Sequence, residues 1–407
     1  MRLLGHPPEC SPVAYAPGSP KAPVAYAPGS PGPLSSQAPT VIHPKEPASL
    51  AAPGTEAFKP ASAPGTPASS APVSPPADSE AAQKLRVVKG HRGWVMAVAF
   101  SHDRNMLASG GVDGSVRLRS FSKARPKEQI LPQVHQAGVH SLAFSPNNKL
   151  LATGSGALDG LVFLWDVQGE EAELMAVLRG HTAPVEAVAF SPDGRLLASA
   201  GTDRIVRLWD ITAKSAEERA TLKGHTDTVK TLAFSPDSRV VASAGQDEAI
   251  RLWSLGRIWT EELAVLRGPF GHILSVAFSP DAQTLASGSQ DYLVRLWDLG
   301  GRQSGERSVI KLKEHPGVVR LVMFPPEGNQ LVSVGSQGQA ILWDVVKYER
   351  LRKWSMPVKP MVCSVALTFD GRYLATGTSE GSVVVYRLDF KKAGDESGPS
   401  SQVVGDE

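Results

Sequence analysis

Residues 178–210, LRGHTAPVEAVAFSPDGRLLASAGTDRIVRLWD, contain the pattern that decides the fold. Three runs within it, VEAVAFS, RLLASAG and IVRLWD, are rich in Val, Leu, Ile, Phe and Trp, which favour β-strands. Residues 191–194 (SPDG) and 201–204 (GTDR) are turn sequences, because Pro presets φ and Gly tolerates a positive φ. Together with the preceding run ELMAVL, the stretch predicts a four-stranded antiparallel sheet. One such sheet cannot bury both of its faces, so copies of it must lie beside it.

The same pattern recurs along the chain. With His181 as the marker, the matching positions lie 43 to 46 residues apart and are His91, His135, His181, His225, Pro269, His315 and Val358. Nine residues after each marker stands an aromatic residue or Leu, namely Phe100, Phe144, Phe190, Phe234, Phe278, Phe324 and Leu367. A repeat of this period, with a Gly-His opening and a Trp-Asp end, resembles the WD-repeat β-propeller family over about residues 85–390. The resemblance implies an all-β, seven-bladed propeller of four-stranded antiparallel blades.

The two ends of the repeat region each hold part of one blade. Residues 85–88 correspond to the last strand of a blade, whereas residues 361–388 supply three strands without a fourth. We therefore expect the N-terminal strand to pair with the C-terminal blade, which closes the ring and removes exposed sheet edges. The predicted propeller covers residues 84–390. A disordered Pro/Ala/Ser-rich tail at 1–83 and a disordered polar tail at 391–407 are predicted to flank it.

The first 83 residues contain 19 of the 33 prolines and repeat the nonapeptide PVAYAPGSP at 12–20 and 23–31. Proline breaks helices and sheets, so we expect a partly polyproline-II tail without a core. Its PxxP and Ser/Thr-Pro matches could serve a proline-reading domain or a kinase. In so proline-rich a segment such matches arise by chance, and the composition favours a spacer over a ligand.

Composition limits the function more than it identifies one. The formal net charge is +2 with both signs mixed, which gives no reason to expect nucleic acid or an anionic membrane. The two cysteines, Cys10 and Cys363, make neither a disulfide framework nor a zinc site, and no cofactor or metal motif is found. No apolar run reaches membrane-spanning length and no signal peptide is recognised. We expect a soluble, cytoplasmic protein, monomeric as a propeller within a larger assembly.

Ser or Thr, His, Asp and Trp recur together in three blades. These residue types include those of a nucleophilic triad, but a catalytic site has no reason to occur three times around one ring. In the family that this sequence resembles, the four positions form a structural chain in which Asp accepts from His, His meets the hydroxyl, and the hydroxyl meets the indole N–H. We expect such tetrads at His135, Thr153, Asp159 and Trp165, at His181, Ser199, Asp203 and Trp209, and at His225, Ser243, Asp247 and Trp253.

The other four blades lack part of the tetrad. Arg119 replaces Trp in blade one, Pro269 replaces His in blade five, Gln337 replaces Asp in blade six, and blade seven keeps only Thr376. An Arg also recurs two residues before the Trp position in several blades, which we interpret as part of the scaffold.

One loop-bearing face varies from blade to blade. Blades two to four place His140, Glu186, Arg204, Lys230 and Glu248 there, a mixed polar surface. Blades five, six, seven and one are predicted to present an aromatic and aliphatic cluster with basic residues among it: Arg92, Trp94, Met96, Phe270, His272, Leu274, Tyr292, Val318, Arg320, Lys359 and Met361. Such a composition suits a protein interface. Packing of half-buried side chains between blades is the alternative interpretation.

The resemblance implies a non-catalytic scaffold for protein or peptide partners of unknown identity. An enzyme that uses the central channel is a weaker alternative, because the innermost strands show no converging carboxylates or histidines apart from the repeated His. A phosphopeptide or nucleic-acid reader would need a concentrated basic pocket, of which Arg92, Arg320 and Lys359 give only a hint.

Overall fold

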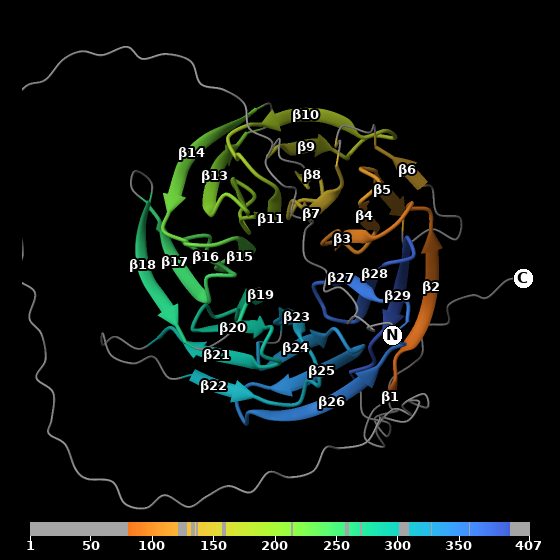
Figure 1. The fold of residues 1–407 in the computed structure, drawn as a ribbon, viewed down its shortest axis with the longest axis vertical. Coiled ribbons are helices and arrows are strands. Elements are labelled where there is room, and N and C mark those ends of the chain that lie inside the picture. The colour runs from red at the N-terminus through yellow and green to blue at the C-terminus, as the bar shows by residue number, and fades with distance from the viewer. Residues whose placement is uncertain are drawn as a thin grey trace, which may run out of the picture. The chain divides into compact units, whose positions relative to one another are not determined.

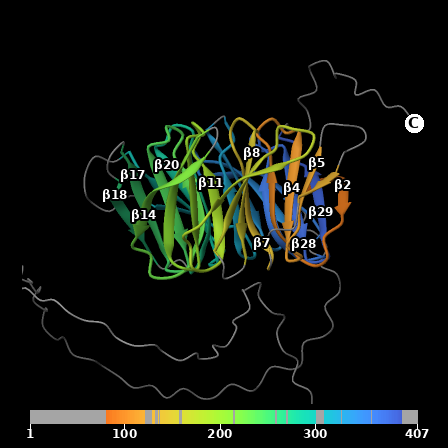
Figure 2. The same ribbon diagram turned by 90° about the horizontal axis from the view of Figure 1, so that it is seen from above.

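The computed structural model describes residues 80–120, 128–131, 135, 137–156, 160–212, 215–256, 260–268, 271–300, 309–326, 328–357 and 359–390. All of them lie in one compact unit, Pro75–Glu407. Within it, seven sheets stand around a ring, with their strands running between two loop-bearing faces (Figures 1 and 2). The sequence predictions for residues 1–79 and 391–407 fall outside the described residues.

In each of the first four blades, the strands follow one another in chain order from the inside of the ring to the outside. Blade one consists of β3 (Val95–Phe100), β4 (Met106–Gly111), β5 (Val116–Ser120) and β6 (Glu128–Ile130). Blade two consists of β7 (Val139–Phe144), β8 (Leu150–Ser155), β9 (Val162–Asp166) and β10 (Glu173–Leu178). Blade three consists of β11 (Val185–Phe190), β12 (Leu196–Gly201), β13 (Ile205–Ile211) and β14 (Ala216–Lys223). Blade four consists of β15 (Val229–Phe234), β16 (Val240–Gly245), β17 (Ala249–Leu255) and β18 (Thr260–Arg267).

The remaining three blades complete the ring. Blade five consists of β19 (Ile273–Phe278), β20 (Thr284–Ser289), β21 (Val294–Asp298) and β22 (Val309–Leu312). Blade six consists of β23 (Val319–Met323), β24 (Gln330–Gly335), β25 (Gln339–Asp344) and β26 (Glu349–Ser355). Blade seven consists of β27 (Val362–Leu367), β28 (Tyr373–Thr378), β29 (Ser382–Arg387) and, from the other end of the chain, β2 (Gln83–Lys89). None of the described segments is a helix that could cross a membrane.

Ring closure by the N-terminal strand is confirmed. Strand β2 pairs antiparallel with β29, from Gln83 opposite Arg387 to Lys89 opposite Ser382. The strand is longer at both ends than the predicted residues 85–88. Because β2 comes from one end of the chain and β29 from the other, one blade holds both ends of the repeat region together.

A second N-terminal strand, β1 (Glu80–Ala81), was not predicted. It pairs in parallel with the end of β26, so it extends blade six rather than blade seven. The N–H of Ala82 also donates to the carbonyl of Ser355 at 3.1 Å. The entering chain therefore joins two neighbouring blades before it completes the ring.

The core lies in the seams between blades. In the seam between blades three and four, Leu208 and Ala220 of blade three belong to one apolar cluster with Phe234 and Trp253 of blade four. Near the start of each innermost strand, its pairing register with the second strand of the same blade shifts, as it does between Val185 and Ala187. Burying an aromatic or aliphatic side chain in such a seam contributes about 1.5–3 kcal/mol.

Candidate functional site

The first candidate constellation is the repeated tetrad. In blade three, Trp209 Nε1 donates to Ser199 Oγ at 2.8 Å, and Ser199 Oγ lies 2.8 Å from His181 Nε2. The other ring nitrogen, Nδ1 of His181, lies 2.8 Å from Asp203 Oδ2. Blade four repeats the chain with distances of 2.8, 2.7 and 2.9 Å among Trp253, Ser243, His225 and Asp247.

Blade two contains the corresponding hydroxyl contacts. Trp165 Nε1 donates to Thr153 Oγ1 at 3.2 Å, and Thr153 Oγ1 lies 2.7 Å from His135 Nε2. The predicted partner Asp159 falls outside the described residues. In blades two, three and four the hydroxyl residues are completely buried, which keeps any substrate from reaching their oxygens. The arrangement satisfies buried polar groups and offers no accessible nucleophile.

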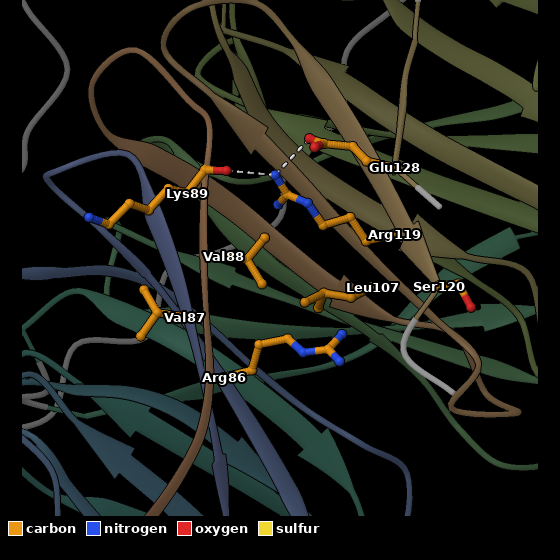
Figure 3. A pocket seen from close by; sticks show the side chains of 8 residues that line it. All are labelled: Arg86, Val87, Val88, Lys89, Leu107, Arg119, Ser120 and Glu128. Carbon is orange, nitrogen blue, oxygen red and sulfur yellow. Dashed lines mark hydrogen bonds and ion pairs between the residues drawn. The ribbon is translucent and has the colours of Figure 1, made fainter. Parts of the chain in front are cut away.

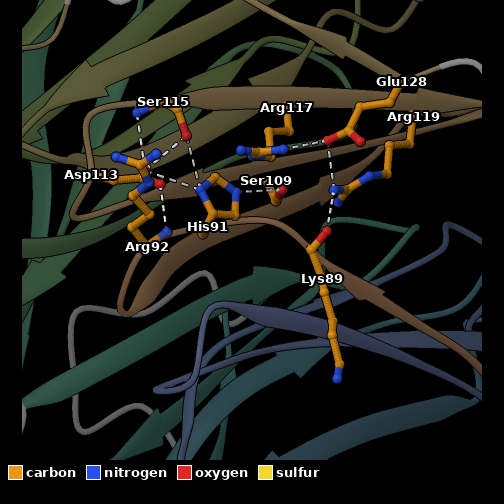
Figure 4. A network of polar contacts seen from close by, with 9 residues as sticks. All are labelled: Lys89, His91, Arg92, Ser109, Asp113, Ser115, Arg117, Arg119 and Glu128. Carbon is orange, nitrogen blue, oxygen red and sulfur yellow. Dashed lines mark hydrogen bonds and ion pairs between the residues drawn. The ribbon is translucent and has the colours of Figure 1, made fainter.

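Blade one keeps the polar part of the tetrad without the tryptophan. Figure 4 shows the ring of His91 between Ser109 Oγ, at 2.8 Å, and Asp113 Oδ1, at 3.1 Å. Burial alone would raise the pKa of Asp113, but the backbone N–H of Arg92, the hydroxyl of Ser115 and the His91 ring hold it at about 2. This carboxylate stays ionised and fixes the start of the blade.

Blade five replaces the missing histidine with an arginine. Arg295 is only 2% exposed, and its guanidinium donates to both carboxylate oxygens of Asp291, at 3.1 and 2.5 Å, and to Ser289 Oγ at 3.1 Å. The residue at the same position of blade three, Arg207, instead pairs outward with Glu218 at 2.6 Å. The turn Asp of blade five therefore keeps a cationic partner although the marker His is absent.

Blade six keeps the histidine but not its carboxylate. His315 Nε2 lies 2.6 Å from Ser333 Oγ, which also accepts from Trp343 Nε1 at 2.8 Å. Gln337 occupies the Asp position and is exposed, while Nδ1 of His315 is buried without a hydrogen-bond partner. Burial, together with the charge of Lys353, lowers the pKa of His315 to about 4.

The second candidate constellation is the predicted surface on blades five, six, seven and one. Its described members are all half-buried or exposed. We call them the loop-face arc: Arg92, Trp94, Met96, His272, Leu274, Tyr292, Val318, Arg320, Lys359 and Met361. Phe270 falls outside the described residues. Tyr292, at 49% exposure, and Met361, at 38%, are the most open apolar members.

Backbone hydrogen bonds place the loop-face arc at one end of the blades. The carbonyls of Trp94, His272, Val318 and Met361 each accept from the turn between the second and third strands of their own blade, at 2.8–2.9 Å. The innermost strands β19, β23, β27 and β3 contact one another in that order around the ring (Figure 1). Tyr292, which has a φ of 72°, occupies such a turn itself. The structure therefore brings the described members onto one face of four successive blades.

The cations of the loop-face arc lack carboxylate partners. Among the described residues, no ion pair involves Arg92, Arg320 or Lys359, and Nε of Arg320 is buried without a hydrogen-bond partner. The charged groups of these three side chains are therefore available to an acidic or carbonyl group of a partner.

On blades two to four, three of the predicted polar residues form one cluster, whereas the exposed Arg204 and Glu248 have no ion pair among the described residues. Glu186 on β11 lies 3.1 Å from Nζ of Lys230 on β15 and 3.5 Å from Nδ1 of His140 on β7. The sequence-based expectation that no such groups converge on the innermost strands is therefore wrong. It failed because these three residues lie on different blades, and only the curvature of the ring brings them together. Burial alone would raise the pKa of Glu186, but His140 and Lys230 hold it at about 2.

Comparison with known proteins agrees with this architecture. The family model described as "WD domain, G-beta repeat" matches residues 82–120, 128–166, 172–210, 216–254, 260–298 and 351–387. The unmatched interval contains the first three strands of blade six, where Gln337 departs from the repeat pattern, yet that blade is complete in the structure.

Curated relatives are similar over short stretches. Small ribosomal subunit protein RACK1y of Oryza sativa subsp. japonica is 37% identical over 90 residues, which cover 21% of this chain and 24% of the relative. Actin-interacting protein 1 of Drosophila melanogaster is 34% identical over 89 residues, covering 22% and 14%. WD repeat-containing protein srw1 of Schizosaccharomyces pombe (strain 972 / ATCC 24843) is 32% identical over 85 residues, covering 21% and 15%. The chain thus spans at most about a quarter of the length of these relatives. Because the family model matches more than half of the chain, and the blades have the matching form, the chain belongs to the WD40-repeat family.

Proposed function

We propose that this protein is a non-catalytic scaffold that binds protein or peptide partners through the loop-face arc. One observation carries the proposal. On blades two to four, Lys230 and His140 both approach the carboxylate of Glu186. Among the described residues, Arg92, Arg320 and Lys359 have no carboxylate partner and lie near exposed or half-exposed aromatic and aliphatic side chains. Interfaces concentrate their binding energy in such aromatic and arginine anchors.

Exposure supports an interface over simple packing between blades. Inter-blade packing buries side chains, as it does with Trp209 at 3% exposure. Tyr292 is instead half exposed, and its positive φ holds it in a turn at the rim. A large aromatic ring kept in solvent is a natural anchor for a partner.

Family membership supports the same class of function. Two relatives carry names that describe assembly with other molecules, a small ribosomal subunit protein and an actin-interacting protein. By analogy, we propose action within a larger assembly and a cytoplasmic location for this chain, with partners of its own.

The cluster of Glu186, Lys230 and His140 is a poor candidate for catalysis. A carboxylate with a pKa of about 2 is a weak general base at neutral pH, and Lys230 and His140 already engage Glu186. We therefore favour binding over chemistry on this face.

Two tyrosines of equal exposure allow a matched test. Tyr292 and Tyr348 are each 49% exposed and have positive φ, but they lie in turns at opposite ends of the strands. A photo-crosslinking amino acid placed at position 292 of the full chain should capture a defined partner in cell extract, and Arg320→Ala should reduce that capture. The same amino acid at position 348 should not capture it. Capture of that partner at 348 alone would contradict the proposal.

A further inference from the structure

The seam that closes the ring differs chemically from the other seams. In the seams from blade two to blade five, an outer-strand Ala shares an apolar cluster with the Trp of the next blade, as Ala176 does with Trp209 and Ala264 with Trp297. Blades one, five and six have Gln129, Ile310 and Arg352 at the Ala position. In the sheet registers, Arg86 takes the Ala position of blade seven, and Arg119 takes the Trp position of blade one. An Ala–Trp contact is thus replaced by two cations.

Arg119 does not fill the space of the missing indole. Its guanidinium donates to the carbonyl of Lys89 at 2.9 Å and to Glu128 at 2.7 Å, which ties β5 to β2 and β6 (Figure 4). A groove of about 450 Å³ opens between these strands. Figure 3 shows Val88 and Leu107 lining it, with the guanidiniums of Arg119 and Arg86 on either side of them. We call this the closure groove; its lining residues are Arg86, Val87, Val88, Lys89, Leu107, Arg119, Ser120 and Glu128.

Positive charge in the closure groove exceeds negative charge. Glu128 is the one carboxylate among the described residues that line the groove, and it is shared by Arg117 and Arg119, each at 2.7 Å. Among the described residues, Arg86 has no carboxylate partner, while the side chain of Lys89 points away from the groove and only its carbonyl faces Arg119 (Figure 3). Arg119 is only 6% exposed, so its charge is poorly compensated by water. A negatively charged occupant would complement this balance.

The rim of the groove suits an extended chain. Among the described strands, β2 stands at the end of its sheet and pairs with β29 alone, so backbone groups on its other edge lie outside any strand pairing, although the carbonyl of Lys89 accepts from Arg119. Two strands beside the groove carry exposed apolar residues, Val87 on β2 at 40% exposure and Ile130 on β6 at 54%. A peptide could bind along this edge by β-augmentation.

We propose that the closure groove binds an acidic peptide segment of a partner protein, with one aromatic side chain inserted against Val88 and Leu107. Its carboxylates pair with Arg86, and its ring takes the place that tryptophan fills in blades two to six. The guanidiniums beside the ring add cation–π attraction. This site lies on the circumference of the ring, away from the loop-face arc, so it can succeed or fail independently of the proposed function.

Fluorescence anisotropy of the full chain with a fluorescein-labelled Asp-Glu-Trp-Asp-Glu peptide tests the proposal. Wild type should bind this peptide more tightly than the Ala-centred Asp-Glu-Ala-Asp-Glu, the basic Lys-Lys-Trp-Lys-Lys, or a labelled single-stranded oligonucleotide. Arg86→Ala should weaken binding about tenfold, the loss expected for one anchor. The double variant Arg86→Ala/Arg119→Trp, which restores the ordinary seam, should weaken binding further while retaining the melting temperature. Lys223→Ala, at the position of blade three that matches Lys89, is the control and should not change binding.

Three results would overturn the proposal. One is that wild type does not bind the acidic peptide at concentrations up to about 1 mM, the weakest range of useful affinity. Another is equal binding by the folded double variant. The third is tighter binding of the oligonucleotide or the basic peptide, which would assign the groove to a different ligand class.

Discussion

Nζ of Lys230 lies 3.1 Å from Oε2 of Glu186, across the boundary between blades four and three. Because His140 approaches the same carboxylate from blade two, three blades share one neutralised cluster. Among the described residues, no such cluster involves the cations of the loop-face arc. The two halves of one face therefore differ in that only blades two to four hold a carboxylate already bound by cations from neighbouring blades.

Ring closure predicts a stepwise response to truncation. A protein that starts at residue 83 lacks β1, and one that starts at residue 91 also lacks β2. We expect the first to melt slightly below a protein that starts at residue 80, and the second to melt far below it or to aggregate, because the edge of β29 is exposed. Thermal unfolding followed by circular dichroism measures both. Equal melting of the proteins starting at residues 80 and 91 would contradict this closure.

Alanine substitutions at two members of one tetrad should lower the unfolding free energy by different amounts. Trp209→Ala should cost about 3–5 kcal/mol of unfolding free energy, because it empties a buried aromatic site. Ser199→Ala should cost about 1–3 kcal/mol, because the buried indole N–H loses its acceptor. Urea unfolding measures both losses. Covalent labelling of Ser199 in the folded protein by a serine-reactive probe would contradict the claim that its hydroxyl is purely structural and inaccessible.

His315 predicts acid sensitivity in blade six. Its folded pKa of about 4 lies below the ordinary value near 6.5, so the unfolded chain binds the proton more readily. Stability is fully present above about pH 6.5 and falls by about 3 kcal/mol as the pH drops towards 4. Gln337→Asp should supply a partner for Nδ1, raise the pKa of His315 and reduce this loss. Nuclear magnetic resonance titration gives the pKa directly; a wild-type value near 6.5 would refute the prediction.

Removing the carboxylate partner of Arg295 in blade five should lower the unfolding free energy more than removing the partner of Arg207, which holds the same position in blade three. Asp291→Ala removes the carboxylate from a guanidinium that is 2% exposed, and should cost about 3–5 kcal/mol. Glu218→Ala removes the partner of the more exposed Arg207 and should cost at most about 1 kcal/mol. If denaturant unfolding gives equal losses of unfolding free energy for the two variants, burial of Arg295 does not increase the contribution of its ion pair to stability.

The fold was predictable because each blade repeats a local pattern. The run ELMAVL coincides with β10, and the run after His181 coincides with β11 apart from one residue. The predicted turn at residues 191–194 is present, with Gly194 at a φ of 71° and Ser191 bonded to Asp193 at 2.6 Å. Hydrophobic periodicity and turn chemistry act over a few residues, so one sequence suffices to detect them.

Contacts between blades were less predictable. Strand β1 has two residues and pairs with a strand some 270 positions later, a separation that no local pattern records. The sequence showed that Arg119 replaces a Trp. The role of Arg86 could be recognised only in the structure, because ring closure places it beside Arg119. The pairing of Glu186 with Lys230 likewise depends on the curvature of the ring, and exposure at the loop-face arc depends on side-chain packing.

The affinity of the partner captured at Tyr292 tests the central claim most directly. Alanine at Trp94, Tyr292 or Arg320 should each raise its dissociation constant about tenfold, because interface anchors commonly contribute 1–2 kcal/mol or more. Alanine at Lys230 or Tyr348 should leave the constant nearly unchanged. Circular dichroism should show that the arc variants remain folded. If the arc variants bind normally or unfold, while Lys230→Ala weakens binding, the loop-face arc is a packing surface and the partner binds on blades two to four.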